Sequence, residues 1–143
     1  MPGSPFTVAD TLELRSMACA TPATATRTFG RHPGEVPVAR RFIRDALAGH
    51  PASFDAELLT CELVTNAVQH ATDAASVTVA VMRRGEVVHV DVIDDSRIGL
   101  PHWREASGQD EGGRGFQLVN KLAQRWGFLR EDAGTCVWFE IGL

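Results

Sequence analysis

Residues 62–71 read ELVTNAVQHA and are the most informative segment of the chain. With the apolar residues before them they show helical spacing, so we expect one helix over residues 53–71. In such a helix Glu62, Asn66 and Gln69 lie along one edge of the apolar face, because successive residues are about 100° apart. An amide oxygen can bind a hard cation and a carboxylate can accept a proton, which together suit magnesium and phosphate chemistry. The spacing is also compatible with a plain solvated edge.

The same ten residues resemble the N-box of the GHKL ATPase superfamily, in the form found in small anti-sigma factor serine/threonine kinases. This resemblance implies a Bergerat fold, an α+β two-layer sandwich with helices on one face of a mixed, mostly antiparallel sheet. It also implies that ATP and Mg²⁺ are the cofactors, that Asn66 binds the metal and that Glu62 is the general base. We interpret His70 as a structural polar group, because Glu62 already supplies a base.

The spacing of apolar residues predicts the remaining elements. Helical spacing indicates two further helices, over residues 35–47 and 115–123. Alternating apolar residues predict four strands, at residues 77–81, 88–92, 125–130 and 136–141. Residues 94–113 have no periodicity, and a loop of that length in a small domain is more often functional than idle. The order of these elements favours helices layered on one face of a sheet.

Two positions resemble the adenine-binding part of the superfamily. Asp94 follows the second strand of the predicted hairpin, where the resemblance implies that it accepts a hydrogen bond from the adenine amino group. Thr135 opens the last strand, and its hydroxyl would join the adenine network. Taken alone, Asp94 could belong to an ordinary turn and Thr135 could reflect β propensity. Ser96 and Ile98 stand where the superfamily often has glycines.

A glycine-rich segment at residues 112–116 resembles the phosphate-binding box at the start of a helix. Glycines let the backbone approach phosphates, and the amides of a helix N-terminus attract anions. The resemblance implies that Gly113, Arg114 and Gly115 contact the nucleotide, although a solvent-facing arginine is a comparable reading of Arg114. Some kinases of the superfamily have an arginine just before this box, where the chain has Glu111.

Composition narrows the class of protein. The chain has 143 residues, 44% of them hydrophobic, which is enough for one domain with a core. We expect an arm over residues 1–28, with a short edge strand at 11–14, and the ATP-binding domain over 29–143. The net charge of −4 argues against nucleic acid as a partner. Three cysteines at wide spacings suggest reduced thiols, and no segment reads as a signal peptide or a membrane span. We therefore expect a soluble cytoplasmic protein.

The resemblance implies a protein kinase that regulates transcription. Its partners would be a sigma factor and a STAS-domain anti-anti-sigma protein, whose serine would receive the ATP γ-phosphate. Residues 98–112 would form a short ATP lid, with Trp103 either beneath it or facing a partner. A second hypothesis is a non-catalytic, ATP-gated binding module, which Glu111 favours slightly. A histidine kinase catalytic domain ranks third, since the chain shows no dimerisation helix with a phosphoacceptor histidine. A homodimer is left open.

Overall fold

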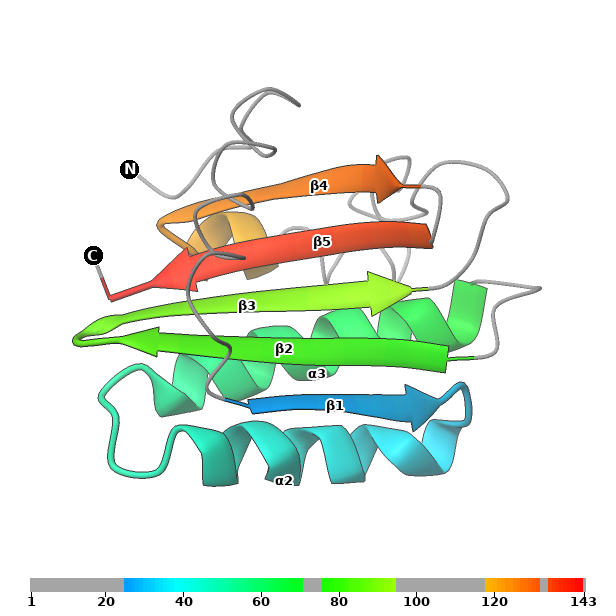
Figure 1. Cartoon of the computed structure of the whole chain (residues 1–143), viewed down its shortest axis with the longest axis horizontal. Helices are drawn as coiled ribbons and strands as arrows, with labels where there is room; N and C mark the ends of the chain where they lie inside the picture. The colour runs from blue at the N-terminus through cyan, green and yellow to red at the C-terminus, as the bar shows by residue number, and fades with distance from the viewer. Residues whose placement is uncertain (1–24, 71–75, 95–117, 132–133, 143) are drawn as a thin grey trace.

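The computed structural model of the chain describes residues 25–70, 76–94, 118–131 and 134–142. Five strands in this part of the chain form one sheet with the order β1-β2-β3-β5-β4. The strands are β1 (Ala25–Gly30), β2 (Ser76–Arg84), β3 (Val87–Asp94), β4 (Arg125–Glu131) and β5 (Gly134–Ile141). Helices α2 and α3 lie together against one face of the sheet (Figure 1). The predicted two-layer α+β architecture is confirmed.

Helix α2 (Val36–Ala46) follows a 3-10 turn, η1 (Pro33–Glu35), and confirms the helix predicted at residues 35–47. The Nδ1 atom of His32 accepts a hydrogen bond from the backbone N–H of Gly34, at 2.9 Å, which satisfies one of the free donors of the 3-10 turn. Ala39 and Ile43, one turn apart, are fully buried against the rest of the domain.

Helix α3 (Ser53–His70) is the predicted N-box helix, and residue 71, the last of the expected helix, lies outside the described residues. It packs beside α2, and Glu57 joins the two helices through ion pairs with Arg44 at 2.7 Å and Arg40 at 3.3 Å. The hydrogen bond from Arg44 lowers the pKa of Glu57; burial opposes the shift, and the charges of both arginines support it. The carboxylate therefore stays ionised although it is largely buried.

Strands β2 and β3 form the predicted hairpin, and β4 and β5 form the predicted closing pair. Gly85 has a φ of 61° in the hairpin turn, a conformation that residues with a Cβ rarely adopt. The valines of β2 and β3 that were predicted to alternate are buried against the helices. Every strand pair among the described residues is antiparallel, so the sheet expected to be mostly antiparallel is wholly so in this part of the chain.

Strand β1 is an element that apolar spacing does not predict. It pairs antiparallel with β2 and begins at Ala25, inside the segment expected to be an arm. Phe29 is its only fully buried side chain, so its sequence carries little of the period-two signal. The edge strand expected at residues 11–14 and the first residues of the helix expected at 115–123 lie outside the described residues, whereas residues 118–122 are helical as predicted.

The face of the sheet opposite the helices carries a buried histidine between two carboxylates. The Nε2 atom of His89 is 2.9 Å from Asp91 Oδ1, and its Nδ1 atom is 3.0 Å from Glu140 Oε2. The imidazole ring stacks on Trp138 with centroids 5.5 Å apart. Because each ring nitrogen faces a carboxylate, the arrangement favours an imidazolium that donates both hydrogen bonds.

The surroundings of this network shift the pKa values of His89 and Glu140. Burial lowers the pKa of His89, but hydrogen bonds with Asp91 and Glu140 outweigh it and raise the value above normal. Burial raises the pKa of Glu140, but the hydrogen bond with His89 and the charges of His89, Arg125 and Arg84 outweigh it and lower the value. His89 and Glu140 are therefore both charged between the ordinary pKa values of a glutamate and a histidine.

This network predicts how stability depends on pH. The stabilisation from His89 is complete below its unfolded pKa of about 6.5 and is lost as pH rises through the higher folded value. The contribution of Glu140 is complete above its unfolded pKa of about 4.3 and is lost as pH falls through the lower folded value. Chemical denaturation at several pH values should show wild type losing stability relative to His89→Gln as pH rises above neutrality, by at most about 1.4 kcal/mol per unit. Parallel curves for the two proteins would contradict this account of the network.

Candidate functional site

The elements that carry the described site residues meet at one end of the sandwich. The C-terminal end of α3, the end of β3 and the start of β5 all lie at this end, which is on the right in Figure 1. Helix α3 packs on β3 and β5, so its last turns lie over the ends of these strands. The chain therefore brings the N-box and the two adenine-box residues to the same end of the fold.

Asn66 is the most informative residue of this site. It is only 4% exposed, and neither Oδ1 nor Nδ2 of its side chain has a hydrogen-bond partner among the described residues. A buried polar group without a partner costs about 1–3 kcal/mol, so a native structure retains one where a ligand or another function requires it. Glu62, one helical turn earlier, is partly exposed and so remains accessible to a reacting group.

Asp94 and Thr135 form the second part of the site. They lie directly opposite each other on the neighbouring strands β3 and β5. Asp94 also lies opposite Val77, a core residue, so both side chains point toward the helix layer. Both residues are buried, at 5% and 6% exposure. A carboxylate and a hydroxyl at adjacent positions can read the hydrogen-bonding edge of a base.

The donor set fits a magnesium ion that is held largely by a bound nucleotide. Within the described residues no group of three or more His, Cys, Asp or Glu side chains could hold a metal ion. Mg²⁺ commonly takes one or two protein oxygens and completes its shell with phosphates and water. The unpartnered Oδ1 of Asn66 is such an oxygen, so the site fits Mg-ATP better than a free cation.

Of the other residues considered for the site, the structure describes only Gln69 in full. Gly113, Arg114, Gly115 and Glu111 lie outside the described residues, and so does the side chain of His70. Gln69 is exposed, whereas Asn66 is buried. The residues predicted to form one polar edge of the helix therefore do not share one environment. The reason is that Asn66 lies on a buried side of the helix, whereas Gln69 lies on a side that faces solvent.

Arg31 supports the site and was not predicted. Its guanidinium donates hydrogen bonds to the backbone carbonyls of Ala67 and Val68, the latter at 3.0 Å. These carbonyls belong to the last turn of α3 that the structure describes, and carbonyls near a helix C-terminus commonly accept hydrogen bonds from basic side chains. Arg31 therefore caps α3 beside Asn66, and a positive charge there also complements the helix dipole. Its place in an irregular segment after β1 gives no sequence signal for this role.

Comparison with protein families identifies the domain. Residues 29–141 match the family described as histidine kinase-like ATPase domain. The chain belongs to this family. The resemblance to the GHKL superfamily is thereby confirmed, and the unpartnered Asn66 lies within the matched residues.

A solved structure supports the same assignment. The histidine kinase-like ATPase domain is similar to the Erythrobacter litoralis EL346 blue-light activated histidine kinase, with 28% sequence identity and a TM-score of 0.51. The match covers 77% of this chain and 41% of that kinase, so the chain spans less than half of its length. A comparison with curated proteins finds no match.

Membership of this family indicates that the domain binds ATP. A histidine kinase-like ATPase domain is an ATP-binding domain of a kinase or ATPase, and the buried groups at the end of α3 agree with that role. In the part of the chain that the structure describes, no helix is long and apolar enough to cross a bilayer.

Proposed function

We propose that this domain is a protein serine/threonine kinase that transfers the γ-phosphate of ATP to a serine of a STAS-domain antagonist and thereby regulates a sigma factor. The observation that carries the proposal is the pairing on α3 of Asn66 with Glu62 one turn away: a buried amide with no hydrogen-bond partner among the described residues beside an accessible carboxylate. Nucleotide binding alone requires the first of these groups. Phosphotransfer also uses the second.

The side chains divide the work of binding and transfer. Asn66 offers its amide oxygen to Mg²⁺, which when bound neutralises charge on the phosphates. Asp94 accepts a hydrogen bond from the adenine amino group, and Thr135 adds a hydroxyl beside it. Glu62 accepts the proton of the attacking serine hydroxyl as the new oxygen–phosphorus bond forms and the bond from the γ-phosphorus to the bridging oxygen breaks, so that ADP leaves. From the sequence, the backbone amides of Gly113 and Gly115, with Arg114, supply donors for the phosphates.

The choice of serine and of partner rests on the resemblance of residues 62–71 to anti-sigma factor kinases. The experiment that tests it is incubation of the protein with ATP labelled at the γ-phosphate and a panel of STAS-domain proteins, followed by mass spectrometry of the labelled partner. We expect one partner to carry phosphoserine. A protein that binds Mg-ATP and a STAS partner tightly but labels no serine would instead be an ATP-gated binding module.

Asp94→Asn tests the adenine contact separately from phosphate binding. The amide keeps the shape of the carboxylate but can present a donor to the adenine amino group, which leaves two donors facing each other. We expect affinity for ATP to fall about tenfold or more, which corresponds to about 1.4 kcal/mol. Calorimetry with ATP and GTP should show a smaller loss for GTP. Equal losses of affinity for both nucleotides would show that Asp94 does not select adenine.

A further inference from the structure

A groove of about 550 Å³ lies between the first strand of the sheet and helix α2. It runs along α2 from Val38 to Ala46 and along β1 from Ala25 to Arg27, at the β1 side of the sheet, whereas the residues expected to bind nucleotide lie on α3, β3 and β5 (Figure 1). The volume is within the range of known ligand pockets. The groove is therefore separate from the nucleotide site, and none of the residues assigned to nucleotide chemistry lines it.

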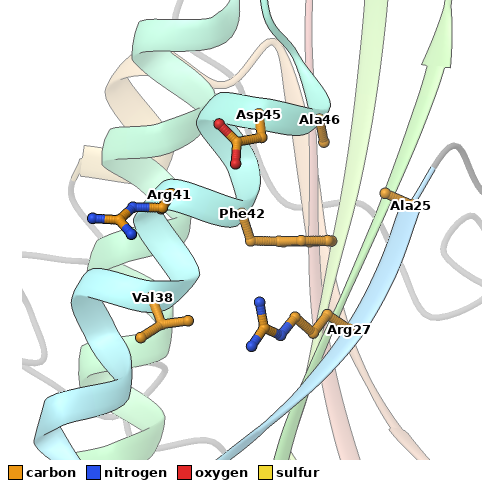
Figure 2. Close-up of a pocket in the computed structure, with 7 residues that line it drawn as sticks. All are labelled: Ala25, Arg27, Val38, Arg41, Phe42, Asp45 and Ala46. Atoms are coloured by element: carbon orange, nitrogen blue, oxygen red, sulfur yellow. The ribbon is translucent and has the colours of Figure 1, made fainter.

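The floor of the groove is apolar. It consists of Ala25 from β1 and of Val38, Phe42 and Ala46 from α2. The two alanines leave space because their side chains end at Cβ. Figure 2 shows the Phe42 ring extending from α2 toward the strand, and the ring is fixed by an edge-to-face contact with Phe29 at 5.9 Å. The floor is therefore preformed.

The rim of the groove is positively charged. Arg27 and Arg41 lie on it together with one carboxylate, Asp45. Figure 2 shows the Arg27 side chain pointing from β1 into the space between strand and helix, and its guanidinium lies 5.2 Å from the ring centroid of Phe29. Neither arginine forms an ion pair with a described residue, unlike Arg40 and Arg44, which both bind Glu57. In a chain of net charge −4, this excess of positive charge favours an acidic ligand.

Strand β1 is also an edge of the sheet. Among the described residues its only strand partner is β2. Every second backbone N–H and C=O of an edge strand points away from the sheet, so such an edge can accept a further strand. Ala25 and Arg27 are two residues apart and lie opposite the core valines Val81 and Val79, so both point toward the helix layer and into the groove.

The geometry points to this groove as a docking site for an extended acidic peptide segment of a partner protein, which adds to β1 as a sixth strand. Successive residues on one face of a strand are two apart. An apolar side chain can therefore lie over Phe42 and Ala46 while a carboxylate two residues away reaches Arg27 and Arg41. The backbone supplies affinity and the alternating side chains supply specificity. This function is independent of nucleotide chemistry.

A phage-displayed library of random nonapeptides, selected on the full-length protein, tests the proposal. We expect enrichment of peptides in which an acidic residue lies two positions from an apolar one. A synthetic peptide from the enriched pool should bind at least about tenfold more weakly to Arg41→Glu and to Arg27→Glu, because like charges then face each other. Hydrogen exchange should show that the peptide slows exchange of the β1 amides.

Lys121→Glu is the matched control. It makes the same change in net charge at an exposed residue of the helical segment 118–122, beside β4 at the other edge of the sheet. Peptide affinity of this variant should equal that of wild type, and ATP binding should be unchanged in the two groove variants. The proposal is overturned if no peptide is enriched, if the groove variants bind as well as Lys121→Glu, or if protection appears away from β1. Saturation of the groove by inorganic phosphate, or by a second copy of the chain, would also overturn it.

Discussion

Glu62→Gln is expected to slow phosphotransfer to the partner serine by about a hundredfold or more while leaving affinity for Mg-ATP nearly unchanged. Glutamine has the size and hydrogen-bonding reach of glutamate but cannot take up the serine proton. Because Glu62 is partly exposed and forms no ion pair among the described residues, its replacement should leave the fold intact. Single-turnover transfer and nucleotide calorimetry, measured on the same preparations, separate the two effects.

The control for this prediction is a nearby carboxylate with a structural role. Glu57, on the same helix, is held by Arg40 and Arg44, so Glu57→Gln should lower the free energy of unfolding without a specific loss of transfer in the folded protein. If Glu62→Gln transfers phosphate at the wild-type rate, Glu62 is not the base. If it loses affinity and transfer equally, Glu62 acts in binding.

Asn66→Ala is expected to lose at least about tenfold in magnesium-dependent ATP affinity, because the cation loses a protein oxygen ligand. The same variant should be no less stable than wild type when nucleotide is absent. The reason is that the wild-type amide is buried with no hydrogen-bond partner among the described residues, and an unsatisfied buried amide costs about 1–3 kcal/mol that alanine does not incur. Calorimetry with Mg-ATP and chemical denaturation without it measure the two effects.

Thr60→Val provides the matched control for Asn66→Ala. The hydroxyl of Thr60, on the same helix, is also buried without a partner among the described residues, but it belongs to none of the nucleotide boxes. Valine should therefore preserve or raise stability and leave ATP affinity unchanged. If Asn66→Ala destabilises the nucleotide-free protein strongly while keeping Mg-ATP affinity, Asn66 has a structural role and the site assignment is wrong.

The helices and the central strands could be predicted because their signal is local. Apolar residues at helical spacing over several turns predict helix α3. Strict alternation of valines on either side of a glycine turn predicts β2 and β3. Asn66 could be placed at the edge of the apolar face in the same way. Its burial, with no hydrogen-bond partner among the described residues, depends on how α3 packs in the domain, which no local sequence pattern contains.

The features that escaped prediction are contacts between distant parts of the chain. Arg31 reaches Ala67, 36 residues away. Alternation in β3 indicates that His89 and Asp91 share a face, but their partner Glu140 lies 51 residues beyond His89. Strand β1 is a strand because it pairs with β2, and its own residues give only a weak signal. Sequence patterns predict helices and strands, whereas contacts between distant residues depend on how the strands pair and how the helices pack on the sheet.

The side-chain amide signal of Asn66 in a ¹⁵N NMR spectrum offers the most direct test that this residue binds Mg-ATP. The signal is identified by its absence from the spectrum of Asn66→Ala and is then followed during titration of the wild-type protein. We predict a saturable shift with ATP and Mg²⁺ together, and a much smaller shift with ATP in the presence of EDTA. A signal that stays unmoved while calorimetry on the same sample reports Mg-ATP binding would contradict the account.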